Sequence, residues 1–135
     1  MDISESIATL VVWLDTKGYY VDFDKSGDDS VDTENKIVSI NSTRKKETQL
    51  YILLHECGHV LIDRNDTIVG YRETQEKYSE RTNIHKVFVV MEEVEAWKRG
   101  RMLASRLGIK IDEEKWDLDL SRALNKYIKW ASGTL

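Results

Sequence analysis

Residues 51–62 read YILLHECGHVLI and carry the pattern HExxH inside an apolar run long enough to form a buried helix. On a helix His55 and His59 are four residues apart, so both imidazoles project from one face and can hold the same metal ion. Glu56 is offset from that face and could reach a water at the ion, but it is poorly placed to be a third ligand. The motif therefore supplies two nitrogen ligands and a general base, which is typical of a catalytic zinc site with an open coordination position.

The surroundings of the motif favour this interpretation over a purely structural one. The flanking residues are uncharged and apolar on both sides, whereas a chance match would usually fall in a polar or loop segment. Gly58 would let a neighbouring element approach the helix closely. The structural alternative is a buried helix whose two histidines only satisfy hydrogen bonds in the core, and the metal site is the stronger hypothesis.

Composition predicts one domain covering residues 1–135, because this length supports a single hydrophobic core. Apolar residues make up 41% of the chain and charged residues 33%, as in ordinary soluble proteins. With a single cysteine, no signal peptide and no membrane-spanning stretch, we expect a cytoplasmic protein without membrane contact. The net charge of −4 disfavours direct binding of nucleic acid.

Periodicity predicts helices and strands before the motif. Residues 2–17 have an apolar stripe at helical spacing, so we expect an amino-terminal helix capped by Asp2 or Ser4. Residues 19–24 and 36–41 alternate as strands, and the polar residues 25–30 between them predict an acidic hairpin turn. The strand ending at Asn41 is the expected edge for pairing with an extended peptide.

Beyond the motif the pattern becomes irregular and then helical again. Residues 63–82 predict a long connection bordering the site. A helix is expected over residues 84–107, and residues 112–131 predict one further helical segment or two short ones. The core-facing stripe of the first of these helices is formed by Val87, Val90, Met91, Val94 and Trp97. Candidate donors to a developing oxyanion are Tyr71, Tyr78 and His85.

A third metal ligand must come from outside the motif. A metzincin would need a histidine at position 65, where this chain has Asn65. Cys57 lies on a different helical face from the two histidines, and His85 stands at the edge of the irregular stretch. The later helix carries an acidic cluster that is better placed and would complete a His, His, Glu set. Its members are Glu92, Glu93 and Glu95.

The order of these segments resembles the ImmA/IrrE family of metallopeptidases. The resemblance rests on the strand residues 37–41, the motif residues 55–61 and the sequence EVEA at residues 93–96, and it spans about residues 3–104. It implies zinc held by His55, His59 and Glu93, with Glu56 as the base. Trp97 stands where the family usually has an asparagine, and the apolar ending with proline is missing after Leu103.

The expected fold is α+β and zincin-like. It comprises an amino-terminal helix, a small twisted sheet, the HExxH helix, a long glutamate-bearing helix and a carboxy-terminal helical segment. The expected function is zinc-dependent hydrolysis of a peptide bond in a protein partner. The resemblance implies a DNA-binding regulator, such as a transcriptional repressor, in a phage or mobile element. Two alternatives are a non-catalytic zinc-containing interaction protein of a phage or mobile element, and a metal-dependent hydrolase of another bond.

Overall fold

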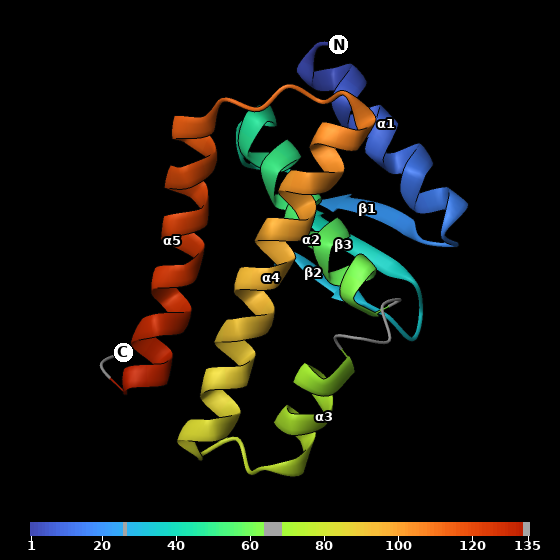
Figure 1. Ribbon diagram of the computed structural model, residues 1–135. Coiled ribbons are helices and arrows are strands. Elements are labelled where there is room, and N and C mark those ends of the chain that lie inside the picture. The colour runs from blue at the N-terminus through green and yellow to red at the C-terminus, as the bar shows by residue number, and fades with distance from the viewer. Residues whose placement is uncertain (26, 64–68, 134–135) are drawn as a thin grey trace.

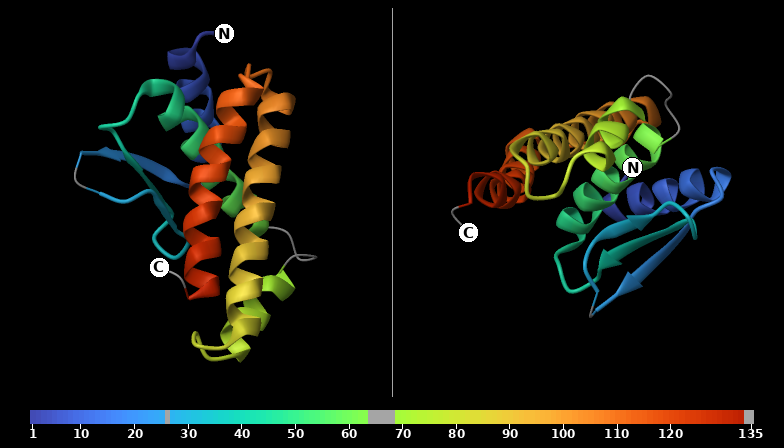
Figure 2. Two further views of the ribbon diagram at one scale, coloured as in Figure 1. Left: turned by 90° about the vertical axis from the view of Figure 1, so that its left-hand side faces the viewer. Right: turned by 90° about the horizontal axis from the view of Figure 1, so that it is seen from below.

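The computed structural model describes residues 1–25, 27–63 and 69–133, and these form a mixed α+β fold that is mostly helical (Figure 1). The described residues comprise five helices and one three-stranded sheet. The sheet forms one layer, α1 and α2 pack on it, and α4 and α5 cover α2 from the other side, with α3 packed on α4 (Figure 2). The HExxH helix therefore lies in the middle layer.

The first helix, α1 (Ile3–Thr16), starts and ends where its sequence predicts. Its N-cap is Asp2, whose Oδ1 accepts a hydrogen bond from the Glu5 backbone N–H at 2.8 Å. The helix stops before Gly18, whose φ of 84° lies in the left-handed region that glycine tolerates. Ile7, Leu10 and Leu14 of its apolar stripe are buried, so α1 anchors the sheet to α2.

The sheet corrects the predicted hairpin. It contains β1 (Tyr20–Asp24), β2 (Ser30–Asp32) and β3 (Ile37–Asn41) in the order β1-β3-β2. The two predicted strands, β1 and β3, pair in parallel, whereas β2 pairs with β3 antiparallel. The short β2 was not predicted. β2 accounts for the parallel pairing of β1 with β3. After β1 the chain forms β2 at the other edge of the sheet, then reverses direction and enters β3 between the two.

The central position of β3 also makes the expected edge strand wrong. β3 has a hydrogen-bonded neighbour on both sides, so the strand ending at Asn41 offers no free edge. Within the described residues the edges of the sheet are β1 and β2. β2 contacts α2 and thus lies on the side of the HExxH helix.

Helix α2 (Lys46–Asp63) is buried over most of its surface and packs closely against α4 (Asn83–Leu107). Glycine makes this approach possible at two points. An added Cβ at Gly58 would lie 1.9 Å from the Ala96 carbonyl oxygen, and one at Gly100 would lie 2.4 Å from the Leu54 carbonyl oxygen. Backbone therefore meets backbone at both glycines.

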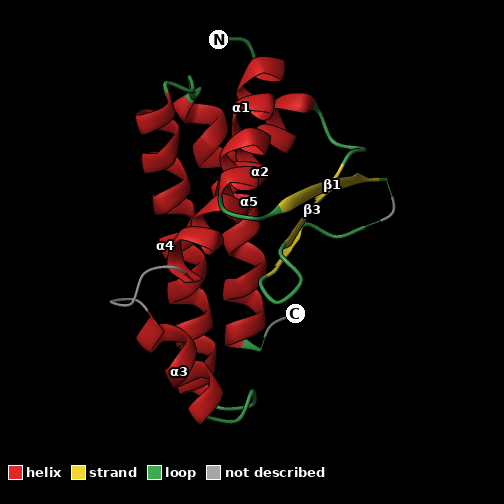
Figure 3. Cartoon of the chain, turned by 90° about the vertical axis from the view of Figure 1, so that its right-hand side faces the viewer, coloured by secondary structure: helices red, strands yellow, loops and turns green. Residues whose placement is uncertain are grey.

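The stretch predicted to be an irregular connection contains a further helix, α3 (Val69–Lys77). Residues 64–68 of that stretch lie outside the described residues. Figure 3 shows α3 beside the amino-terminal half of α4, at the end of the molecule away from the N-terminus. Polar residues dominate α3, so its sequence lacks the apolar stripe by which helices are recognised.

Much of the apolar stripe predicted to face the core from α4 is exposed instead. Val87 is 51% exposed, and Met91 and Val94 are each 38% exposed. Of the predicted stripe only Trp97 is fully buried. The buried face of α4 includes Glu92, because that face passes α3 and the two motif histidines.

The carboxy-terminal segment forms one helix, α5 (Glu113–Ser132), which lies alongside α4 (Figures 1 and 2). Asp112 caps its start by accepting a hydrogen bond from the Lys115 backbone N–H at 3.3 Å. None of the described helices is both long enough and apolar enough to cross a membrane.

The contact at Gly58 leads to a first prediction. Gly58→Ala should lower the free energy of unfolding by about 1–3 kcal/mol or more, because the new methyl group meets the backbone of α4. Alanine's better helix propensity, worth about 1 kcal/mol, offsets only part of this loss. Urea unfolding followed by circular dichroism measures the change.

Gly27→Ala is the matched control, because a Cβ there has only ordinary contacts with the Asp24 side chain at 3.8 Å. Its stability should stay within about 0.5 kcal/mol of the wild type. Equal effects of the two substitutions would contradict the steric explanation.

Candidate metal centre

Two imidazoles and one carboxylate converge between α2 and α4. His55 and His59 lie one helical turn apart on α2, with ring centroids separated by 4.7 Å and ring planes at 80°. Glu93 faces both rings from α4: its Oε2 lies 3.1 Å from His55 Nε2 and its Oε1 lies 3.2 Å from His59 Nε2. One potential ligand atom from each residue falls within 4.8 Å of the other two. The structure thus brings together the three predicted ligands.

These distances fit a single bound metal ion. Ligand bonds of about 2.0–2.2 Å in tetrahedral geometry place neighbouring ligand atoms about 3.3–3.6 Å apart. The Glu93 carboxylate lies close to that spacing from both imidazoles, with Oε2 at 3.1 Å from His55 Nε2 and Oε1 at 3.2 Å from His59 Nε2. This group of two histidines and a glutamate could hold a divalent metal while leaving a coordination position free.

The remaining candidate ligands lie elsewhere. Glu92 faces the other ring nitrogen of His59, with its Oε1 at 3.8 Å from Nδ1. Glu95 turns away and accepts a hydrogen bond from Arg99 Nε at 2.9 Å. Cys57 is buried but does not belong to the group of converging ligand atoms. Of the acidic cluster, only Glu93 belongs to the group of converging atoms that could hold a metal ion.

Helix α3 supplies two residues that the sequence reading missed. Arg72 Nε donates to Glu92 Oε1 at 2.8 Å, and Gln75 Nε2 donates to Glu92 Oε2 at 2.9 Å. Arg72 also pairs with Asp63 at the end of α2. Glu92 is thereby fixed beside His59, in the way that outer carboxylates orient metal-binding histidines. A signal was available, because Arg72 and Gln75 are three residues apart and share one helical face.

The electrostatics of the centre are strongly coupled. Burial on its own would raise the pKa of Glu92, but hydrogen bonds with His59 and the two α3 side chains lower it to about 2. Burial likewise opposes ionisation of Glu93, yet the two histidines hold its pKa well below the usual range. Burial would lower the pKa of His59, and the carboxylates of Glu92 and Glu93 instead raise it to about 10. A metal ion must therefore displace a proton from His59.

Glu56 lies beside the group of converging ligand atoms without belonging to it. Its side chain is directed toward the centre, with Oε1 at 3.8 Å from His55 Nε2. It is only 5% exposed, and burial raises the pKa of its carboxyl group, with the nearby Glu93 charge adding to the effect. A raised pKa suits a carboxylate that takes up and returns a proton near neutral pH.

An aromatic side chain fixes the orientation of His55. The ring of Trp97 stacks on the imidazole with centroids 4.5 Å apart and planes at 24°, and Trp116 meets Trp97 edge-on at 5.0 Å. His55 Nδ1 is buried and has no hydrogen-bond partner among the described residues. Stacking therefore holds this ring in place of the usual hydrogen bond at the second nitrogen.

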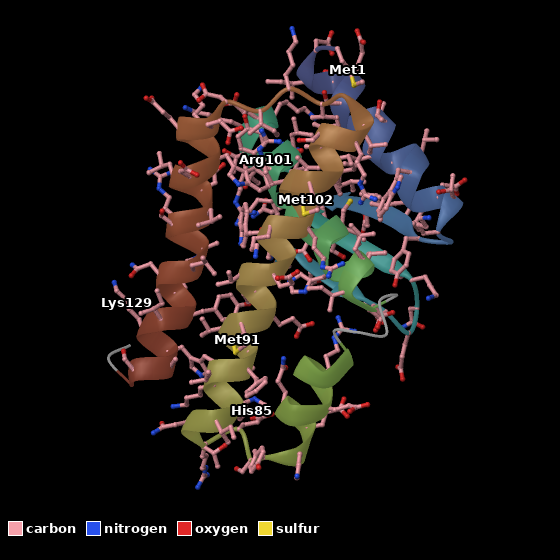
Figure 4. The ribbon with its side chains drawn as sticks, viewed as in Figure 1. Met1, His85, Met91, Arg101, Met102 and Lys129 are labelled. Carbon is pink, nitrogen blue, oxygen red and sulfur yellow. The ribbon has the colours of Figure 1, made fainter. Side chains whose placement is uncertain are left out.

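Tyr127 of α5 is affected by the charge of the centre. Burial raises the pKa of its hydroxyl, and the charge of Glu93 adds to the effect. His85 lies at the start of α4, where its Nδ1 is 2.7 Å from the Gln75 carbonyl oxygen (Figure 4), and Tyr78 is exposed. The side chain of Tyr71 lies outside the described residues.

Comparisons of this chain with protein-family models, curated proteins and solved structures found no match. The interpretation of the centre therefore rests on its own geometry.

Three glutamine variants test the assignment of the third ligand. Glu93→Gln should weaken cobalt or zinc binding by more than about 100-fold, because it removes a coordinating carboxylate. Glu92→Gln should weaken binding by about 10-fold through loosening of His59. Glu95→Gln is the matched control and should bind metal like the wild type. Competition with a chromophoric chelator measures all three affinities, and an equal loss in the Glu95 variant would contradict the assignment.

The pKa of His59 predicts how the stability of the metal-free protein changes with pH. The folded state binds the His59 proton with a pKa of about 10, against an ordinary value of 6.5. This stabilisation is complete below pH 6.5 and is lost as the pH rises through about 10. Urea unfolding of the metal-free protein should therefore show a decline in stability over this range. His59→Gln should lack this part of the decline, and an unchanged pH profile in that variant would contradict the prediction.

Proposed function

We propose that this protein is a zinc-dependent endopeptidase of zincin-like fold, related to the ImmA/IrrE metallopeptidases. The observation that carries the proposal is the buried carboxylate of Glu56 beside the His55, His59 and Glu93 group. A site that only held a structural metal would have no need of a base in this position. The order of the candidate ligands along the chain, two on α2 and one on α4, agrees with the order of segments in that family's sequence pattern.

Zinc bound by the two histidines and Glu93 would polarise the carbonyl of the substrate and lower the pKa of a water at the site. Glu56 accepts the proton of that water as its oxygen attacks the carbonyl carbon. The same carboxyl group then passes the proton to the leaving amine as the carbon–nitrogen bond breaks. Glu92 keeps the His59 ring oriented throughout, while Trp97 keeps the His55 ring in place.

A substrate segment in extended conformation fits the edge formed by β2. This strand pairs on one side only within the described part of the sheet, and it contacts α2. Asp29, which directly precedes β2, is close enough for its charge to act on Glu56. Main-chain hydrogen bonds along β2 would hold the peptide beside the base, as in other cases of strand addition.

The natural partner that we propose is a regulatory DNA-binding protein, and the setting is the cytoplasm of a cell carrying a phage or mobile element. This part of the proposal follows from the family resemblance. The chain's own net charge of −4 gives no support for direct contact with nucleic acid.

One observation favours the non-catalytic alternative, a zinc-containing interaction protein. His55 is only 7% exposed and Glu56 only 5%, so a substrate must reach a deeply placed centre. The two functions differ in a measurable way. An interaction protein would bind zinc and a partner but leave the partner intact.

Substitution of the base tests the proposed chemistry. Glu56→Gln should retain one zinc per chain, and its rate of peptide cleavage should fall at least about 100-fold. A neutral amide is too weak a base to accept the proton of the water. Partners captured on this inactive variant serve as substrates for the wild type, and cleavage is followed by mass spectrometry. Glu95→Gln is the control and should remain active. Undiminished cleavage by zinc-loaded Glu56→Gln would remove Glu56 from the mechanism, and intact partners after incubation with the wild type would favour the interaction protein.

A further inference from the structure

The outer face of α4 is apolar, although no described element of the structure covers it. Six residues between positions 84 and 102 are exposed, and they recur at intervals of three or four residues. One of the six is Lys98, and the other five are apolar. We call these five the outer stripe: Ile84, Val87, Met91, Val94 and Met102. In the left view of Figure 2, α4 forms the side of the molecule opposite the sheet, so the stripe faces outward.

The outer stripe has the size and shape of a helix-binding surface. Val87 is 51% exposed and Met102 is 63% exposed, and the five residues together expose roughly 400 Å², a patch size that is often functional. The stripe is one side chain wide and about 27 Å long, given the rise of an α-helix. Met91 and Met102, labelled in Figure 4, lie at two levels along it. Intervals of three and four residues are those of a coiled-coil seam, so a second helix with the same seam fits it best.

A second copy of this chain supplies such a helix. Packing one outer stripe on another would bury roughly 800 Å² from the two stripes alone. Side chains of α3 and α5, which flank α4, extend the contact to the roughly 1,000 Å² that a specific interface needs. Because both copies present the same surface, the pair closes on itself around a two-fold axis and leaves neither stripe exposed.

Charge sets the direction in which the two helices pair. In α5, residues 113–119 carry four carboxylates and one lysine, whereas residues 120–132 carry three basic side chains and no carboxylate. α5 lies alongside α4, so a two-fold axis that crosses α4 within the interface places the second α5 on the same side, running in the opposite direction (Figure 1). The acidic half of each α5 then faces the basic half of the other, which favours association. A parallel pair would instead place Lys98 against Lys98 and move the second α5 to the other side of α4, away from the first.

We propose that two copies of this protein associate through the outer stripe, with their α4 helices antiparallel about a two-fold axis between Met91 and Val94. Met91 of each copy then packs on Val94 of the other. Lys98 lies opposite Val87 of the second copy, with its methylene groups on the apolar row and its ammonium group in solvent. Glu93 projects from α4 toward the histidines of α2 rather than into this contact. The association therefore does not depend on the function proposed above.

Sedimentation velocity between about 5 and about 500 µM protein tests the association. The wild type should form a reversible dimer with a dissociation constant on the order of 50 µM, as expected for a small interface. Val87→Glu should raise this constant at least about 30-fold, because pairing would bury two carboxylates in an apolar contact. Val12→Glu is the matched control, since Val12 is 64% exposed on α1 and lies outside the outer stripe. It should dimerise like the wild type, and both variants should keep the circular dichroism spectrum of the wild type.

A thiol-specific cross-linker of short reach tests the antiparallel direction. Chains with Met91→Cys, next to the proposed axis, should be joined efficiently into dimers. Chains with Ile84→Cys should not be joined, because their two cysteines would lie about 25 Å apart along the helices. Cys57 is buried and so does not compete for the reagent.

A wild type that stays monomeric at the highest concentration would overturn the proposal, whether the stripe remains bare or another protein covers it. A dimer that Val87→Glu does not weaken, or that Val12→Glu weakens equally, would also overturn it, because the contact would lie elsewhere. Efficient joining of the Ile84→Cys chains would overturn the antiparallel arrangement.

Discussion

The close approach of α2 and α4 is the constraint on which the rest of the structure depends. Packed helices usually lie about 8–10 Å apart, with side chains filling the space between them. Here Gly58 and Gly100 remove two of those side chains, so that the backbones meet at Ala96 and Leu54. A glutamate side chain is short compared with the usual separation of helix axes. The close approach therefore brings both oxygens of Glu93 next to imidazoles on the neighbouring helix.

Much of the fold could be predicted where local pattern and burial agree. The amphipathic stripe of α1 and its Asp2 cap are local features, and the structure has both. The hairpin prediction failed because the parallel pairing of β1 with β3 depends on β2, a three-residue strand too short to show alternation. The exposed side of α4 was misread because an apolar spacing identifies a helix face without revealing whether another element covers it.

The same distinction applies to the candidate site. His55, Glu56 and His59 could be predicted because their relation is fixed by one helical turn. Glu93 was predicted over Glu92 only through the family resemblance, because residue spacing alone does not contain the rotation of α4 against α2. Arg72 and Gln75, which bind Glu92, come from a helix that meets α4 only in the folded chain, so their roles became visible with the tertiary structure.

The stacking of Trp97 on His55 has a consequence for spectroscopy. Of the four tryptophans in the chain, Trp97 stacks on His55 and Trp116 meets Trp97 edge-on. An indole stacked on an imidazole loses excited-state energy when that ring becomes charged or binds an ion with partly filled d orbitals. The protein thus contains its own optical reporter, and its ultraviolet emission follows the chemical state of the centre without any added label.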